Sequence, residues 1–220
     1  MVVFSDFDGT IAQEDLVVRL QEAFAPEGWQ EVIHAIVARK MSVRQGVARL
    51  FADLSPETAS VEGMLQFVQK IVHIRDGFWQ LDHDLANRSV PLVVLSGGMR
   101  FWVEPLVAKS HVQAVYCNDL VLNQHGKYEV AFPYGCDALC DQGDCSICKG
   151  ALIRKYDASA YFRIFIGDGV TDYSAALAAD FVFARDRLLT FCQERNIAHC
   201  AFEHFYDVIE WLHDREGELW

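Results

Sequence analysis

The sequence predicts an α/β fold, in which a mainly parallel, Rossmann-like sheet forms the core and a helical cap is inserted after the first strand. Short apolar runs of strand length alternate with helical periodicities, and this pattern is typical of a parallel sheet with helices on both faces. Between about residue 12 and about residue 74 the periodicity is helical throughout. We therefore expect a core of residues 1–12 and 75–220 and a cap of residues 13–74.

The amino-acid composition indicates a folded protein and disfavours several classes of binding partner. Of the 220 residues, 52% are hydrophobic and 23% are charged, which favours a sizeable folded core over disorder. The net charge of -12 disfavours nucleic acid and anionic membranes as partners. No apolar run is long enough to span a bilayer, and no cationic leader precedes an apolar segment, so we expect a cytoplasmic protein. The sequence does not specify an oligomeric state.

The first strand carries the strongest functional signal. Residues 2–5 are apolar or small and too few for a helix, and Asp6 and Asp8 follow them directly. Gly9 comes next and permits a backbone conformation that other residues resist. Two carboxylates in this spacing can share one hard cation if the chain turns between them. Taken alone, the segment is equally consistent with a strand that ends in an acidic turn.

The remaining elements are predicted from periodicity and turn residues. Four amphipathic helices fill the cap; Asp15 is expected to cap the first and Ser42 the third. In the core, Asn123 to Lys127 should form the loop of a β-hairpin. The expected core strands cover residues 90–95, 114–116, 120–122, 128–130, 162–166 and 181–184, and the expected core helices cover 76–87, a segment starting near 149, 171–178, 188–194 and 206–213.

Polar, glycine-bearing loops follow three of these strands. They contain Asp6 and Asp8, then Ser96 and Gly97, and then residues 168–172. The carboxyl ends of parallel strands meet at one edge of a sheet, so these loops should share a cleft, with Lys149 near a helix start beside them. Carboxylates, a lysine and exposed backbone amides suit phosphoryl transfer assisted by Mg²⁺.

In these motifs the sequence resembles the haloacid dehalogenase-like phosphatases. Asp6-Phe7-Asp8-Gly9-Thr10, Ser96, Lys149 and Gly167 to Asp172 match, in order, the four motifs of that family. The resemblance implies that Asp6 is a nucleophile forming an aspartyl-phosphate, and that Asp8 protonates the leaving oxygen and then activates water. It further implies phosphate binding by Ser96, Gly97 and Lys149. Mg²⁺ would be bound by Asp6, Asp8 through its backbone carbonyl, Asp168 and Asp172.

The cap points to a branch of the family. A helical insertion directly after the first motif, called a C1 cap, resembles the phosphoserine phosphatase branch, and further segments resemble the phosphatases of methionine salvage. These segments include Ser42 to Phe51 and the cysteine-rich stretch before Lys149. The resemblance implies a small phosphate ester as substrate, namely a methylthio-substituted enol phosphate. The alternatives are phosphoserine or another small metabolite, and a non-catalytic binding protein of the same fold. Candidate contacts to the leaving group are Asp15, Arg44, Arg49 and Met99.

A loop of four cysteines precedes Lys149. Its spacing, Cys136-x3-Cys140-x4-Cys145-x2-Cys148, can satisfy a tetrahedral Zn²⁺ ion. Free thiols, or a disulfide formed on oxidation, are the alternatives for this aspartate- and glycine-rich loop. The other three cysteines fall in or beside apolar runs and are expected in the core.

Overall fold

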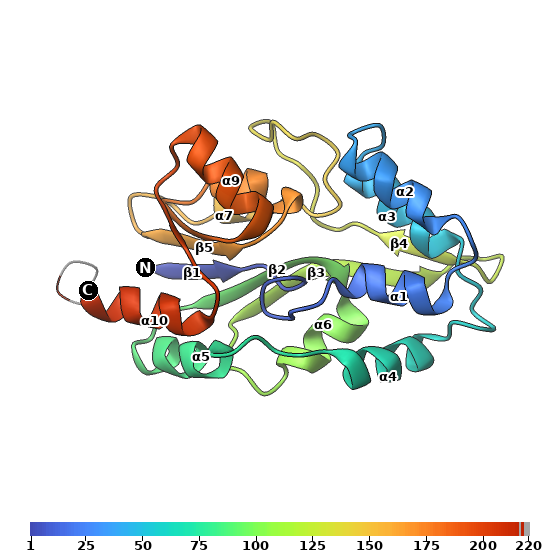
Figure 1. Ribbon diagram of the computed structural model, residues 1–220, viewed down its shortest axis with the longest axis horizontal. Coiled ribbons are helices and arrows are strands. Elements are labelled where there is room, and N and C mark those ends of the chain that lie inside the picture. Colours follow the sequence, from blue (N-terminus) through green and yellow to red (C-terminus); the bar gives the residue numbers. More distant parts are fainter. Residues whose placement is uncertain (216, 218–220) are drawn as a thin grey trace.

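The computed structural model describes residues 1–215 and 217, and in them a seven-stranded sheet runs in the order β4-β3-β2-β1-β5-β6-β7 (Figure 1). Neighbouring strands are parallel except β3 and β4, which form an antiparallel hairpin. The predicted α/β class with a mainly parallel sheet is confirmed. The strands are β1 (Val2–Ser5), β2 (Leu92–Met99), β3 (Ala114–Leu122), β4 (Tyr128–Ala131), β5 (Arg163–Gly167), β6 (Phe181–Ala184) and β7 (His199–Ala201).

Strand β1 lies at the centre of the sheet and is buried on both faces. It pairs with β2 on one side and β5 on the other, with Phe4 opposite Val93 and Phe165. Side chains alternate along a strand, so Val3 joins one apolar cluster while Val2 and Phe4 join the other. A strand that is buried on both faces consists of consecutive apolar residues. This is why β1 could be predicted from the sequence.

Helices cover both faces of the sheet. Helices α5, α6 and α10 lie on one face and α7, α8 and α9 on the other (Figure 1). The core helices are α5 (Phe78–Asn87), α6 (Arg100–Val107), α7 (Lys149–Ile153), α8 (Tyr173–Ala176), α9 (Asp186–Arg195) and α10 (Phe205–Asp214), with a short 3₁₀ helix, η1, at Val170–Asp172. Within the described part of the chain, no helix has both the length and the apolar character needed to cross a membrane.

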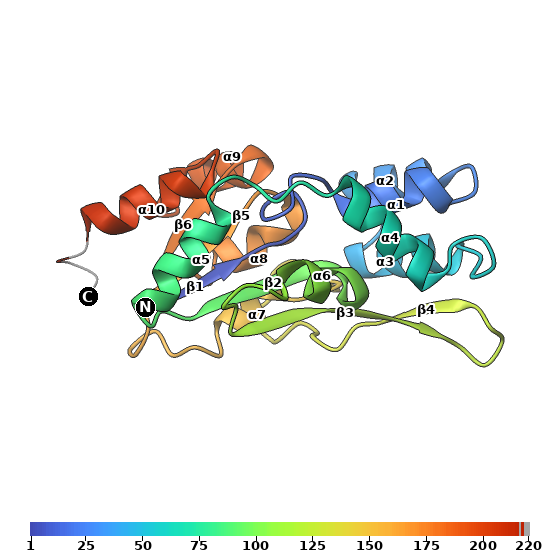
Figure 2. The ribbon, with the colours of Figure 1, turned by 90° about the horizontal axis from the view of Figure 1, so that it is seen from below.

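Four helices lie together at one end of the molecule, beside the extended β3–β4 hairpin (Figure 2). They are α1 (Leu16–Phe24), α2 (Trp29–Val37), α3 (Val43–Ala52) and α4 (Val61–Ile71). The predicted caps form, because the backbone N–H of Val18 donates to Asp15 Oδ1 at 3.0 Å and that of Gln45 to Ser42 Oγ at 3.1 Å. We propose that this group is the inserted cap. The proposed core extends to residue 220, and its residues 216 and 218–220 lie outside the described part of the chain.

The structure differs from the predicted elements in β2 and β3. Strand β2 does not end before Ser96 but continues to Met99, because Met99 pairs with Asn118 of β3 beyond an irregularity in the register. The predicted strands at 114–116 and 120–122 are one strand. Helix α6 and strand β7 were not predicted; α6 contains Pro105, which is disfavoured inside helices, and β7 spans only three residues.

The hydroxyl of Tyr128, on β4, joins the hairpin to the cap by donating to the backbone carbonyl of Ala59 at 2.7 Å. Because Tyr128 is only 4% exposed, Tyr128→Phe leaves a buried carbonyl without this donor. We expect it to lower the free energy of unfolding by about 1–2 kcal/mol, measured by urea denaturation. The matched control is Tyr206→Phe, at a tyrosine that is 49% exposed. Equal effects of the two variants would contradict a stabilising role for this bond.

Candidate active site

A buried lysine between two carboxylates forms the floor of the site. Asp6 follows directly after β1, and its Oδ1 accepts a hydrogen bond from Lys149 Nζ at 2.6 Å. The same nitrogen donates to Asp172 Oδ1 at 2.5 Å. Lys149 and Asp172 are fully buried and Asp6 is 4% exposed, so these charges are withdrawn from water and depend on one another.

Asp172 also organises the loop after β5. Its second oxygen, Oδ2, accepts from the backbone N–H groups of Asp168 and Gly169, each at 3.0 Å. Asp168 is further fixed by Thr10, whose hydroxyl donates to Asp168 Oδ1 at 2.8 Å. As a result, oxygens of Asp6, Asp168 and Asp172 lie within 4.8 Å of one another. Carboxylate oxygens gathered in this way are suitable ligands for a hard divalent cation.

The electrostatics of these carboxylates fit a cation site. Burial, followed by the negative charge of Asp172, raises the pKa of Asp6 well above its usual value. The same two causes, in the same order, raise the pKa of Asp168 to about 6. Burial alone would lower the pKa of Lys149, but the charges of Asp172 and Asp6 outweigh it and the pKa is raised. One ammonium group thus faces three carboxylates, and the excess negative charge favours a bound cation.

The carboxyl group of Asp8 has different partners. Its Oδ2 accepts from the hydroxyl of Ser96 at 3.1 Å, and its Oδ1 accepts from the backbone N–H of Leu16 at 3.2 Å. Burial, with a smaller contribution from the charge of Asp15, raises the pKa of Asp8 to about 7. A carboxyl group with a pKa near neutrality can both give and take a proton, which is the property required of a general acid and base.

Close backbone approaches hold the loop after β1 in place. Gly9 has a φ of +82°, and a Cβ there would lie 2.5 Å from Asp168 Oδ2. The guanidinium of Arg75 donates to the carbonyl of Gly9 at 2.6 Å and to that of Thr10 at 2.7 Å. The motif therefore requires glycine for its backbone conformation and for the space that Asp168 occupies.

Two of the predicted phosphate-binding residues, Ser96 and Gly97, lie near the end of β2, beside Asp8. Ser96 is fully buried, and its Oγ accepts from the backbone N–H of Gly98 at 2.9 Å. The carbonyl of Gly97 accepts from Asn118 Nδ2 at 2.9 Å. The structure therefore brings Ser96, Gly97, Lys149 and the four acidic residues into one region.

The predicted contacts to the leaving group are not gathered in the same way. Asp15 caps α1, and Met99 is fully buried in the apolar core. Arg49 faces Asp53 at 3.7 Å on the exposed surface. Arg44 lies over the ring of Phe132, with its Cζ 4.7 Å from the ring centroid.

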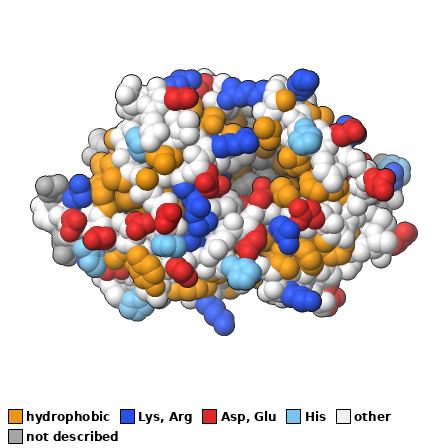
Figure 3. Space-filling view, viewed as in Figure 1, with side chains coloured by type: hydrophobic (Ala, Val, Ile, Leu, Met, Phe, Trp, Pro, Cys, Tyr) orange, Lys and Arg blue, Asp and Glu red, His pale blue; other side chains and the backbone are white. Residues whose placement is uncertain are grey.

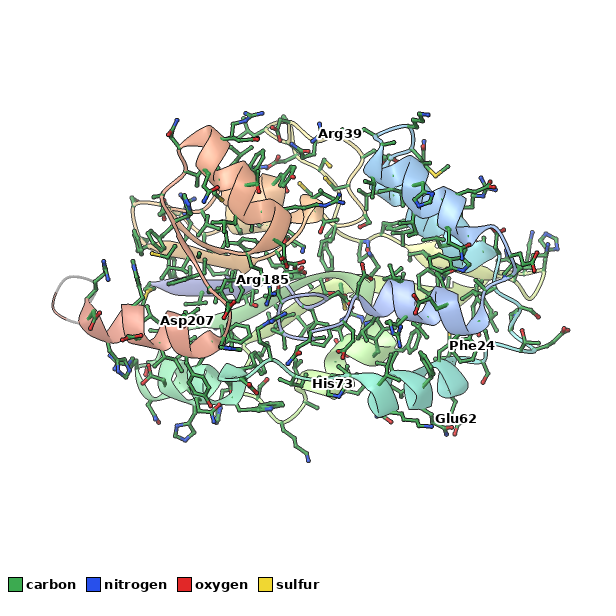
Figure 4. All side chains as sticks on the ribbon, viewed as in Figure 1. Phe24, Arg39, Glu62, His73, Arg185 and Asp207 are labelled. Carbon is green, nitrogen blue, oxygen red and sulfur yellow. The ribbon has the colours of Figure 1, made fainter. Side chains whose placement is uncertain are left out.

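A cleft of about 320 Å³ opens between the cap, the cysteine loop and the loop after β5. Its cap side comes from the end of α2 and the start of α3, including Arg39, which the view with side chains labels (Figure 4). The hollow near the centre of Figure 3 has hydrophobic, basic and acidic side chains around it. The apolar lining residues are Ile36, Val37, Met41, Val43, Ile147 and Val170.

The four clustered cysteines meet beside this cleft. The sulfur atoms of Cys136, Cys140, Cys145 and Cys148 lie within 4.8 Å of one another, and all four are free thiols. Of the remaining three cysteines, all expected in the core, Cys117 and Cys192 are buried, and Cys200 is only partly buried against it.

Comparison with known proteins identifies the family. Residues 3–177 match the haloacid dehalogenase-like hydrolases. The chain belongs to the haloacid dehalogenase-like hydrolase family. The predicted family and the predicted class of enzyme, a phosphoric monoester hydrolase, are confirmed.

Two relatives of this hydrolase carry the same name. A protein of Bacillus cereus (strain AH187) is 39% identical over 207 residues, which are 94% of this chain and 93% of the relative. A protein of Bacillus thuringiensis (strain Al Hakam) is 40% identical, with the same coverage. Both are named 2-hydroxy-3-keto-5-methylthiopentenyl-1-phosphate phosphatase.

Solved structures support the fold of this hydrolase. A phospho-aspartyl intermediate analogue of phosphoserine phosphatase has a TM-score of 0.68, and the match covers 96% of this chain and 97% of that one. A probable phosphoserine phosphatase of Vibrio cholerae has a TM-score of 0.70, and covers 94% of this chain and 62% of that one. Their sequence identities of 18% and 16% make this a likeness of fold.

Sequence reasoning missed three supporting residues. Thr10 was recognised only as part of a motif, although its hydroxyl fixes Asp168. Arg75, just beyond the expected cap, binds the carbonyls of the first motif. Asn118 supports Gly97 from β3. The only available signal was the polarity of each residue beside an apolar strand.

The fit of Gly9 against Asp168 gives a prediction. Gly9→Ala should strain the backbone and displace Asp168, and a displacement of about 1 Å in such a site can cost about a hundredfold in rate. The measurement is hydrolysis of an aryl phosphate in the presence of Mg²⁺.

Gly28→Ala is the matched control, because Gly28 has a φ of +95° but open space where a Cβ would lie. Both variants should lose about 1–2 kcal/mol of stability from the left-handed conformation. Only Gly9→Ala should lose activity beyond its loss of folded protein. Equal activities of the two folded variants would contradict the proposed fit.

Proposed function

We propose that this hydrolase is a Mg²⁺-dependent phosphomonoesterase that converts 2-hydroxy-3-keto-5-methylthiopentenyl 1-phosphate to the dihydroxy-ketone in methionine salvage. The observation that supports the chemistry best is the hydrogen-bonded group of Asp6, Lys149 and Asp172, with the Asp8 carboxyl held apart from it by Ser96. The name of the relatives supports the substrate. We also propose a cytoplasmic location, as for other enzymes of small-metabolite salvage.

The acidic residues fit the cation that this chemistry needs. Asp6 and Asp168 offer carboxylate oxygens, Asp8 would add its backbone carbonyl, and the fully buried Asp172 completes the group. Both oxygens of Asp172 already accept hydrogen bonds, so Asp172 would act mainly by positioning Asp168 and Lys149. When bound, Mg²⁺ would neutralise negative charge on the phosphoryl group. A structural Zn²⁺ ion in the cysteine loop is a second metal that we propose, apart from the reaction.

In the first step Asp6 acts as the nucleophile. A carboxylate oxygen of Asp6 attacks phosphorus, and the bond from phosphorus to the leaving oxygen breaks, which gives an aspartyl-phosphate. Lys149 fixes the orientation of Asp6 through their 2.6 Å hydrogen bond and supplies positive charge beside the transferring group. The backbone amides and hydroxyl at the end of β2 are suited to bind phosphoryl oxygens.

Asp8 moves the proton in both steps. In its protonated form it gives the proton to the leaving oxygen. It then takes a proton from water, whose oxygen attacks phosphorus and breaks the bond to Asp6, releasing inorganic phosphate. The elevated pKa of Asp8, about 7, suits this exchange near neutral pH. Its hydrogen bonds to Ser96 and Leu16 keep the carboxyl group oriented.

We propose that the cleft, which lies beside the catalytic residues and is not lined by them, holds the methylthio end of the substrate. A thioether chain needs apolar surface, and the side chains at the junction of α2 and α3, with Ile147 opposite, supply it. Phosphoserine would need partners for both an ammonium and a carboxylate group. Arg39 and Lys40 line the cleft, whereas no acidic residue does among the lining residues identified in the described part of the chain. The complete set of acids and Lys149 argues against a non-catalytic protein.

Asp6→Asn tests the nucleophile. The change removes the attacking carboxylate with little change in volume, so the activity of the folded protein should fall at least about a thousandfold. The measurement is phosphate release with Mg²⁺, with circular dichroism as the check on folding. Asp53→Asn, at a cap residue whose side chain is 53% exposed, is the control and should keep full activity. Substantial turnover by Asp6→Asn would exclude the aspartyl-phosphate mechanism.

Substrate preference tests the assignment within the family. We expect kcat/KM for the methylthiopentenyl phosphate to exceed that for O-phosphoserine and for an aryl phosphate by several powers of ten. Removing Mg²⁺ with a chelator should abolish turnover, and added Mg²⁺ should restore it. A preference for O-phosphoserine would overturn the substrate, and equal slow turnover of all three would leave only the general phosphatase chemistry.

A further inference from the structure

We infer that Cys136, Cys140, Cys145 and Cys148 bind one structural Zn²⁺ ion, and that this ion fixes the loop connecting Lys149 to the cap. The four thiols take no part in the proposed hydrolysis. Their role therefore needs a separate explanation, which the geometry of the sulfur atoms provides.

The sulfur atoms have the spacing of a tetrahedral metal site. Zn–S bonds of about 2.3 Å place the ligand sulfurs of a tetrahedron about 3.8 Å apart. The sulfurs of Cys140 and Cys145 are separated by 3.8 Å, and all four lie within 4.8 Å of one another. A disulfide would need about 2.05 Å. Four thiolates around one point are a ligand set for zinc, or for iron as the main competitor.

Packing does not account for the convergence of these side chains. The loop around them is mostly exposed, and its Leu139 is 73% exposed instead of entering a core. Gly143 and Asp144 both have positive φ values, 60° and 39°, and reverse the chain so that Cys145 returns to Cys136. There the backbone N–H of Cys145 lies 3.4 Å from the sulfur of Cys136. From Gly135 to Asp144 this loop has no buried apolar side chain, and its apolar anchor, Ile147, lies beyond the turn. A metal that cross-links the four sulfurs can hold the exposed part in this conformation.

One side of the cluster connects to Lys149. Cys148 directly precedes Lys149, is the N-cap residue of α7, and donates its backbone N–H to the carbonyl of Tyr134 at 2.9 Å. A metal bound to the sulfur of Cys148 would therefore fix the start of the helix that carries the buried lysine. This consequence depends on the proposed function, whereas the metal site itself does not.

The other side of the cluster meets the cap. Asp144, next to Cys145, accepts a hydrogen bond from the hydroxyl of Ser42 at 2.5 Å, and its backbone carbonyl accepts from Arg44 N–H at 3.4 Å. Ser42 also caps α3, so the loop contacts the first turn of a cap helix. The cysteine loop thus contacts both the start of α7, which carries Lys149, and the start of α3 on the cap side of the cleft.

Metal content is the direct test. The full chain, produced with zinc supplied and dialysed against buffer containing Mg²⁺, should retain about one equivalent of zinc by elemental analysis. Cys145→Ser and the more exposed Cys136→Ser should lose the zinc. Cys192→Ser, at a buried cysteine outside the cluster, is the matched control and should keep it. Reconstitution with Co²⁺ should give the absorption of a tetrahedral thiolate site, absent from Cys136→Ser.

Three results would overturn the zinc site. The wild-type protein could contain almost no zinc, it could contain iron instead, or the Cys136→Ser and Cys192→Ser proteins could contain equal amounts of zinc.

A second measurement tests the role of the zinc ion. Zinc-free protein supplied with Mg²⁺ should lose about ten- to a hundredfold in kcat/KM, as metal sites do when supporting groups are removed. Unchanged activity would overturn the positioning role. If the intact protein bound zinc but hydrolysed no phosphate ester, the proposed function would fail and the zinc site would stand.

Discussion

The buried ammonium group of Lys149 is the interaction on which the rest of the site depends. A fully buried lysine is costly unless its charge is paired, and here Asp6 and Asp172 both accept from it. Asp172 in turn holds the backbone of Asp168. The position of each acid is therefore set by a neighbour of opposite charge, by a hydroxyl group or by a backbone N–H group. Removing one member of such a buried group generally costs about 3–5 kcal/mol, so the catalytic arrangement and the stability of the core are linked.

The elements that could be predicted are those with strong local signals. The apolar run of β1 was recognisable, and so were the N-caps Asp15 and Ser42, because each depends on residues close in sequence. The grouping of Asp6, Ser96 and Asp168 was predictable because parallel strands bring their carboxyl ends to one edge, whereas the role of Lys149 was implied by the family resemblance. The sequence order of the motifs then pointed to the family.

The features that could not be predicted depend on contacts between distant segments. Strand β2 passes through Gly97 and Gly98, which locally favour a turn, because Met99 pairs with Asn118 of β3. Arg75 contacts carbonyls of residues 65 positions or more before it. The burial of Met99 and the pairing of Arg49 with Asp53 on the surface could not be predicted either. Local periodicity does not indicate which face of a helix or strand lines a cleft.

The central place of β1 has a consequence for how the chain folds. Its two neighbours begin at Leu92 and Arg163, so during synthesis β1 cannot complete its pairing until the chain as far as β5 has emerged. Pairings over such sequence separations are slow, because loop closure is costly before the contacts form. Meanwhile the helices of residues 16–71 contact one another locally and can form first. The nascent chain would thus expose the apolar residues of β1 next to preformed helices. During that time the chain would be most prone to aggregation.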